Sequence, residues 1–203
     1  VTGCSRTDAG VHAVGFKCNF VSAKEIPLAN VISGMNHFLP SSIAVTDAQT
    51  VPEDFNARFD CVSKEYIYRI YNGTVRDPFS VGRAYHYKYR LDEEMLDRQA
   101  KDYIGIHDFS SFRAVGSDVA TTVRTIFNAG VFRDGDTVCF RVEGNGFLYN
   151  MVRIMAGTLI YISEGKIRQG SVPEILASRD RLCAGMTLPP DGLYLNKVNY
   201  ERF

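Results

Sequence analysis

The spacing of apolar residues in the first third of the chain predicts two strands and one helix. Between Val14 and Phe20 apolar and polar residues alternate, which is the two-residue period of a half-buried strand. From Leu28 to Leu39 apolar residues recur at helical spacing, and Pro40 ends the predicted helix. Residues 43–51 predict a further strand.

The middle of the chain continues with strands and another helix. Residues 64–72 are β-prone and rich in aromatic side chains, and residues 84–89 follow a similar pattern. Asp92 can cap a helix that runs to Ile104, with acidic residues in its first turn and basic residues later. Two strands over 123–132 and 137–142 are then joined in a hairpin by residues 133–136.

The longest helix is predicted from about Phe147 to Ile162, where Gly165 suits its carboxyl cap. Residues 171–174 have the pattern of a capping box at the start of a short helix, and residues 193–200 close the chain as a strand. Strands and helices mix without regular βαβ alternation. This order predicts an α+β fold with a largely antiparallel sheet.

Composition narrows the class of protein further. The chain of 203 residues is 45% hydrophobic and 23% charged, which is ordinary globular usage for one domain or two small ones. No apolar run approaches the roughly 20 residues that span a bilayer, and no signal peptide pattern is present, so nothing points to a membrane. The five cysteines and four histidines are scattered, which suggests neither a metal site nor disulfides but reduced cysteines in a cytoplasmic protein.

The charge balance argues mildly against a nucleic-acid partner. Lysine and arginine total 23, as do aspartate and glutamate, so the formal net charge is +0. Nucleic-acid-binding proteins are usually basic, because neutralising phosphates supplies much of their affinity. A local basic cleft can still be masked in a neutral total.

A short polar turn between apolar runs, residues 3–13, is the strongest candidate for chemistry. Gly10 allows a sharp bend there, and a carboxylate on such a loop, that of Asp8, can act as a nucleophile or base. The alternative from the residues alone is an Asx turn, in which the Asp8 side chain caps its own backbone.

Four blocks of sequence resemble the tRNA pseudouridine synthase A (TruA-like) family. The first is Arg-Thr-Asp-Ala-Gly-Val-His-Ala at 6–13, and the second is Phe-Asn-Ala-Arg-Phe at 55–59, which leads to Tyr66. The third is Asp-Phe-Ser-Ser-Phe-Arg-Ala at 108–114, and the fourth is Gly-Asn-Gly-Phe at 144–147, which leads to Met-Val-Arg at 151–153. The resemblance extends to Gly-Leu-Tyr-Leu at 192–195, so it covers nearly the whole chain.

The resemblance implies two ferredoxin-like lobes that share a largely antiparallel sheet around a central active-site cleft. Residues 1–60 would be the remainder of the N-terminal lobe with the aspartate loop, and residues 61–203 the C-terminal lobe. In the family a first strand and helix precede the signature, so we expect the chain to be a fragment that lacks this piece.

The implied activity is isomerisation of uridine to pseudouridine in tRNA, without a metal or other cofactor. Asp8 matches the family's catalytic aspartate, and it must be ionised to act, so a cation nearby is expected. Arg153 matches the arginine that pairs with this aspartate, and Tyr66 matches the active-site tyrosine that stacks on the extracted base and helps to take up the C5 proton. Attack by the carboxylate on the base and attack on the ribose both remain open.

The remaining matched residues imply contacts with RNA. Arg6 matches the arginine that helps to evict the target nucleotide, and Leu193 aligns with an apolar residue that lines the base pocket. Arg58 and Arg113 would be RNA-binding or structural arginines. The resemblance also implies a homodimer that binds the anticodon stem-loop of tRNA. Many family members have glycine where this chain has Ser5, which affects the shape of the loop.

Three other hypotheses compete with this one. A non-catalytic RNA-binding module of the same fold would carry RNA on aromatic faces such as that of Tyr66, but simple binding requires no buried carboxylate. An inactive fragment would be stable yet lack part of the RNA site. A hydrolase with Asp8 as its base is disfavoured, because no matched block supplies a partner histidine or second carboxylate.

Overall fold

The computed structural model describes residues 1–116 and 119–201. Contacts between residues divide the chain into two compact units. Unit 1 comprises Val1–Cys4 and Lys17–Asp60, and unit 2 comprises Ser5–Phe16 and Cys61–Phe203. The turn with Asp8 therefore folds with the second half of the chain.

Unit 2 is built on a seven-stranded sheet whose central strand is β4 (Cys61–Tyr71). Its other strands are β2 (His12–Ala13), β5 (Tyr85–His86), β6 (Gly105–Asp108), β7 (Val123–Asp134), β8 (Thr137–Gly144) and β9 (Leu193–Tyr200). The order is β2-β9-β4-β8-β7-β6, with β5 paired to β4. All pairs are antiparallel except β2 with β9 and β4 with β5. The predicted α+β class with a mostly antiparallel sheet is confirmed.

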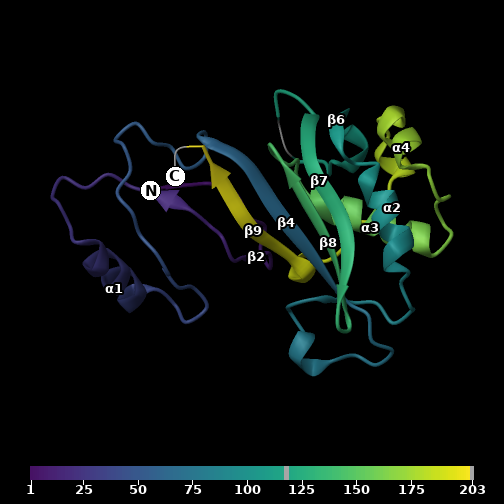
Figure 1. The fold of residues 1–203 in the computed structure, drawn as a ribbon, viewed down its shortest axis with the longest axis horizontal. Coiled ribbons are helices and arrows are strands. Elements are labelled where there is room, and N and C mark those ends of the chain that lie inside the picture. Colours follow the sequence, from purple (N-terminus) through teal and green to yellow (C-terminus); the bar gives the residue numbers. More distant parts are fainter. Residues whose placement is uncertain (117–118, 202–203) are drawn as a thin grey trace. The chain divides into compact units, whose positions relative to one another are not determined.

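Helices cover this sheet and form the main core with it. Helices α2 (Glu93–Lys101), α3 (Met151–Ser163) and α4 (Val172–Ser178) lie on one side of the strands in unit 2 (Figure 1). Helix α2 packs on β7, and α3 packs on α2 and β4. The largest side chains in the core are aromatic: Tyr68, Tyr103, Phe109, Phe112 and Phe140 are fully buried. None of the helices in the described part of the chain is both long enough and apolar enough to cross a bilayer.

Most predicted elements of unit 2 are confirmed. Where they begin and end is set in part by hydrogen bonds from side chains. The Asp92 carboxylate caps α2 by accepting from the Met95 N–H at 2.9 Å, as expected. The predicted strand 84–89 is wrong in extent, since only Tyr85 and His86 pair with β4. Beyond them the Asn72 side-chain amide, and not a strand, donates to the carbonyls of Tyr87 and Tyr89 at 2.7 Å.

The two later helices differ from prediction at their starts. Helix α3 begins at Met151 rather than near Phe147, because Asn150 adopts a left-handed backbone conformation with φ 60°. Its predicted glycine cap is confirmed, since Gly165 has φ +69°. The capping box predicted for α4 is wrong: the Ser171 hydroxyl donates back to the Arg168 carbonyl instead of accepting from the helix.

Unit 1 contains one helix and a two-stranded ladder. Helix α1 (Leu28–Phe38) confirms the predicted helix, and β1 (Thr2–Gly3) pairs antiparallel with β3 (Cys18–Asn19). The strand predicted over residues 14–20 is wrong in extent, since only Cys18 and Asn19 are extended in a ladder there. The strand predicted over residues 43–51 is wrong: the backbone of Val45 bonds to the Asn36 amide side chain at 2.7 and 2.8 Å and not to a strand.

Candidate active site

The turn that carries Asp8 is fixed by its own backbone and by the loop before β9. The Val11 N–H donates to the Asp8 carbonyl at 3.1 Å, and Gly10 adopts φ +84°. A Cβ on Gly10 would lie 3.0 Å from Pro190, so this turn and the 190–191 segment pack closely. Strand β2 then begins at His12 and pairs with β9, which anchors the turn to the sheet.

The Asp8 side chain points to a residue 145 positions later in the chain. Its Oδ2 atom lies 3.4 Å from Nη1 of Arg153, in the first turn of α3. The Asp8 side chain is 38% exposed and that of Arg153 is 14% exposed, so a half-buried carboxylate faces a largely buried cation. Among the described residues, the Asp8 carboxylate makes this contact and not the Asx turn of the alternative hypothesis.

Two neutral oxygen atoms hold the Arg153 guanidinium. Its Nε donates to the Leu188 carbonyl at 2.7 Å, and its Nη1 donates to Oδ1 of Asn150 at 2.6 Å. The Leu188 N–H in turn donates to the Arg153 carbonyl at 3.3 Å. The contacts with Leu188, Asn150 and Asp8 all meet the one planar guanidinium. The guanidinium therefore has a defined orientation toward Asp8.

Tyr66 lies in the middle of β4, and its ring is buried. Its hydroxyl is 3.3 Å from the Ser5 hydroxyl, which belongs to the segment that carries Asp8. The Phe147 ring meets the Tyr66 ring edge to face, with centroids 5.1 Å apart. The aspartate segment and the loop before α3 therefore both reach this tyrosine.

Tyr68, two residues along β4, supports the segment that holds Arg153. Its buried hydroxyl donates to the Pro189 carbonyl at 2.7 Å, next to the Leu188 carbonyl. Burial raises the pKa of Tyr68 strongly, and the nearby positive charge of Arg153 opposes this rise. Tyr68 thus remains a neutral donor that fixes the 188–189 backbone.

The other predicted site residues are less closely joined to this pair. Arg6 is exposed two residues before Asp8, and Leu193 is buried at the start of β9, opposite Tyr68. Arg113 is half-buried, directly after a short 3-10 turn. Arg58 belongs to unit 1, where it is exposed and lies over the Phe59 ring.

A group of side chains beside β2 was missed from the sequence. His12 stacks on Tyr194 with ring centroids 4.5 Å apart, and the Arg69 guanidinium lies over the same tyrosine at 4.5 Å. His12 Nε2 also lies 2.8 Å from the Gly82 carbonyl, and the Tyr194 hydroxyl donates to the Arg83 carbonyl at 2.7 Å. These contacts hold His12, where the chain leaves the turn that carries Asp8 and enters β2.

Asn150 and Leu188 are the other functional neighbours that sequence reasoning missed. The spacing of Asn150, three residues before Arg153, places both on one side of a helix start and was a usable signal. The Leu188 contact uses a backbone carbonyl, so no side-chain pattern could indicate it.

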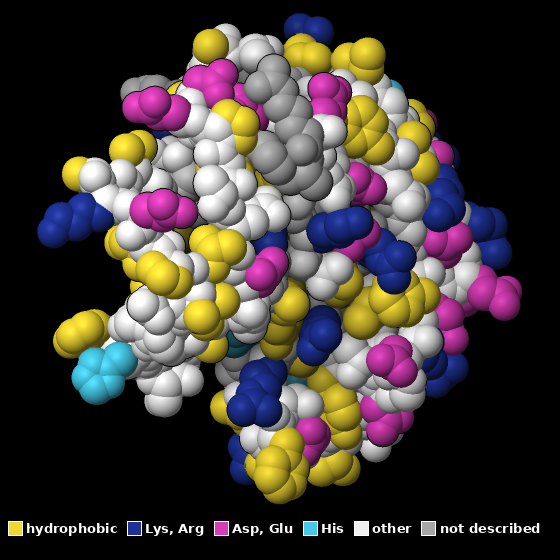
Figure 2. All heavy atoms as spheres, turned by 60° about the vertical axis from the view of Figure 1, so that its left-hand side comes forward, with side chains coloured by type: hydrophobic (Ala, Val, Ile, Leu, Met, Phe, Trp, Pro, Cys, Tyr) yellow, Lys and Arg dark blue, Asp and Glu magenta, His cyan; other side chains and the backbone are white. Residues whose placement is uncertain are grey.

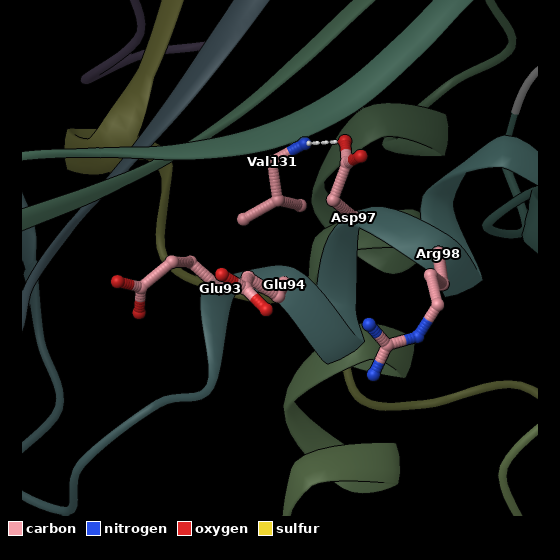
Figure 3. A pocket seen from close by; sticks show the side chains of 5 residues that line it. All are labelled: Glu93, Glu94, Asp97, Arg98 and Val131. Carbon is pink, nitrogen blue, oxygen red and sulfur yellow. Dashed lines mark hydrogen bonds between the residues drawn. The ribbon is translucent and has the colours of Figure 1, made fainter.

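Other surface features do not resemble an active site. A shallow depression over α2 and β7 is lined by Glu93, Glu94, Asp97, Arg98 and Val131, and the Asp97 carboxylate there accepts from the Val131 N–H at 2.8 Å (Figure 3). Within the described residues no group of histidine, cysteine, aspartate and glutamate side chains is arranged to hold a metal ion. Basic and acidic side chains are interspersed on the face drawn in Figure 2, in keeping with the neutral total.

Comparisons with known proteins agree on one family. A sequence profile of the family described as tRNA pseudouridine synthase matches residues 99–201. The chain is 44% identical over 198 residues to tRNA pseudouridine synthase A of Acetivibrio thermocellus, covering 98% of this chain and 81% of that protein. It is 42% identical over 199 residues to tRNA pseudouridine synthase A 2 of Clostridium tetani, with coverages of 98% and 80%. It is 45% identical over 195 residues to tRNA pseudouridine synthase A of Geotalea uraniireducens, with coverages of 96% and 80%.

Proposed function

The chain belongs to the tRNA pseudouridine synthase family, and from this we propose that it isomerises uridine to pseudouridine in tRNA. The observation that carries the proposal is the Asp8–Arg153 ion pair. It joins two sequence blocks 145 residues apart in a partly buried site, where a simple binding module would need no such pair.

The reaction is an isomerisation, so its atoms balance without a co-reactant. The bond between N1 of uracil and C1′ of ribose breaks, the base turns, and a bond forms between C5 and C1′. The proton on C5 leaves, and N1 gains one. The protein therefore has to supply a nucleophile, a proton acceptor for C5 and a space in which the base can turn.

Asp8 is the proposed nucleophile. The Arg153 guanidinium lies 3.4 Å from the Asp8 carboxylate and holds it in one orientation. The 38% exposure of the Asp8 side chain leaves it accessible to a nucleotide brought to this turn. The arrangement is compatible with attack on the base and with attack on the ribose.

Tyr66 and Leu193 are the proposed contacts for the extracted base. Tyr66 has a hydroxyl that can accept or pass on a proton, and its contact with Ser5 connects it to the Asp8 segment. Leu193 would contribute apolar surface from the neighbouring strand. Arg6, exposed on the same turn as Asp8, would occupy the space that the flipped nucleotide leaves.

The wider assembly is also part of the proposal. Apart from β5, β6 and α4, the order β4-α2-β7-β8-α3-β9 is the β-α-β-β-α-β succession of a ferredoxin-like lobe, which supports one such lobe over residues 61–203. A second such lobe over residues 1–60 is proposed from the family resemblance alone. Arg58 and Arg113 would contact the RNA backbone. We further propose a cytoplasmic homodimer that modifies the anticodon stem-loop; light scattering of the purified protein tests the dimer.

Tritium release tests the activity. With tRNA labelled at C5 of uridine, the unmodified protein is compared with its Asp8→Ala and Asp8→Asn variants. We expect release to fall by about a thousandfold or more in both variants, because no other group replaces a catalytic carboxylate. The melting temperature and tRNA affinity should change little, because the Asp8 side chain is partly exposed.

The same assay separates the rival hypotheses. Release that persists in Asp8→Ala would contradict the role of Asp8. Binding of tRNA without release by any protein would favour the RNA-binding module. Release of free uracil without pseudouridine would indicate a hydrolase.

A further inference from the structure

Asn150 occupies an unusual backbone conformation directly before α3. Its φ of 60° and ψ of 7° are left-handed, and Asn150 and Arg179 are the non-glycine residues with positive φ in the described part of the chain. This conformation is costly for most side chains, although asparagine tolerates it better. Such residues cluster at functional sites, where the surrounding structure holds them in place.

The common reason for an asparagine at this position does not apply. An asparagine before a helix normally accepts a hydrogen bond from a backbone N–H of the first turn. The Asn150 side chain makes no such bond to α3. Instead its Oδ1 atom accepts from Nη1 of Arg153 at 2.6 Å. A guanidinium has no acceptor, so the atom that faces it must be the amide oxygen.

The same Arg153 nitrogen also contacts Asp8. Nη1 lies 2.6 Å from Asn150 and 3.4 Å from Asp8, while Nε is bound to the Leu188 carbonyl. The shortest contact of this nitrogen is therefore with a neutral oxygen. A neutral acceptor orients the guanidinium without cancelling its charge, which stays available to the Asp8 carboxylate.

We propose that Asn150 is a positioning residue for the reaction, which holds the Arg153 guanidinium at Asp8 through a neutral hydrogen bond. This inference rests on the proposed pseudouridine synthase activity. The left-handed backbone turns the Asn150 side chain toward Arg153, and the amide supplies an acceptor without a competing negative charge.

Two substitutions separate this role from a structural one. Asn150→Asp keeps the size, the tolerance of the left-handed conformation and the preference for a helix start, but places a second carboxylate on Arg153. Asn150→Gly removes the acceptor and suits the positive φ. A purely structural role predicts that both variants retain activity.

The positioning role predicts a loss in kcat alone. In multiple-turnover tritium release at saturating tRNA, both variants should be slower by about 10- to 100-fold, because misplaced catalytic groups cost rates of this order. Their tRNA affinity in filter binding and their melting temperatures should stay close to those of the unmodified protein. Arg179→Gly is the control, since it relieves the other left-handed residue at the end of α4. It also removes the ion pair of the exposed Arg179 side chain with Asp108, which does not touch Asp8 or Arg153, so it should leave kcat unchanged.

The outcomes are distinguishable. If the unmodified protein releases no tritium, the proposed function fails. If it does and Asn150→Asp keeps a kcat within twofold, the positioning role is overturned. If Asn150→Gly does not fold, Asn150→Asp decides alone. Equal losses in Arg179→Gly and Asn150→Gly would also overturn it, because they would reflect the backbone conformation.

Discussion

The two units of the chain differ in what their helices bury. Ten of the residues in α3, which spans Met151–Ser163, are buried, whereas none of the residues in α1, all of them described, is buried. The Phe38 side chain at the end of α1 is 87% exposed, while Ile154 in α3 is fully buried. Both helices were predicted from the same apolar spacing. The comparison shows that periodicity predicts a helix but not its surroundings.

Glycine in the two helices gives the largest contrast in stability. A Cβ on Gly157 of α3 would collide with the Met186 carbonyl oxygen, whereas a Cβ on Gly34 of α1 would meet nothing within 4 Å. Gly157→Ala should lower the free energy of unfolding by about 3 kcal/mol through overpacking against rigid backbone. Gly34→Ala should raise it by about 1 kcal/mol, because alanine favours a helix interior. Urea denaturation measures both.

A further consequence distinguishes Gly157 from an ordinary core position. Met186 lies two residues before Leu188, whose carbonyl holds Arg153. Gly157→Ala should therefore also lower kcat, while Gly34→Ala should not. Similar stability changes in the two variants would contradict the contrast between the units.

Substitutions of an arginine in unit 1 and of an arginine in unit 2 should differ in their effect on activity. Arg153 of unit 2 is held by three directed contacts, and Arg58 of unit 1 is exposed. Arg153→Lys should lower kcat by about 100-fold, because an ammonium cannot reproduce the planar fork. Arg58→Ala should raise KM for tRNA by only about threefold and leave kcat unchanged, as expected for one phosphate contact. A near-normal rate for Arg153→Lys would contradict the ion-pair argument.

Alkaline pH should change the stability of the two units differently, by a smaller amount than the substitutions above. Unit 1 contains no tyrosine, so it has no phenol that could lose a proton near pH 10. In unit 2, burial, with a contribution from the neighbouring Glu164, raises the pKa of Tyr87 from 10.0 to about 12. The folded state therefore keeps this proton after the unfolded state has lost it. The stabilisation is present below pH 10 and is lost as pH rises from 10 to about 12.

Comparison with Tyr87→Phe isolates this effect. The variant lacks the titrating hydroxyl and its bond to Glu164, so it should be less stable at neutral pH. Its melting temperature should fall less than that of the unmodified protein between pH 10 and 12. Parallel curves for the two proteins would assign the alkaline loss to other groups.

The sequence predicted those elements whose own residues specify them. The aromatic β-prone run gave β4, Asp92 gave the start of α2, and the position of Gly165 gave the end of α3. It failed where a distant side chain replaces a regular backbone partner. Asn36 binds the backbone of Val45 in place of a strand, and Asn72 similarly binds the carbonyl of Tyr87 after β5.

For the candidate site, the sequence by itself determined the chemical groups, and the tertiary structure decided which of them meet. Family resemblance identified Asp8 and Arg153 as partners, and folding places them 3.4 Å apart. The spacing of Asn150 and Arg153 could indicate that they are neighbours, but neither composition nor spacing could indicate the left-handed backbone of Asn150 or that the Leu188 carbonyl holds the guanidinium. Such contacts arise from a left-handed backbone residue and a backbone oxygen, which depend on chain geometry and not on residue type alone.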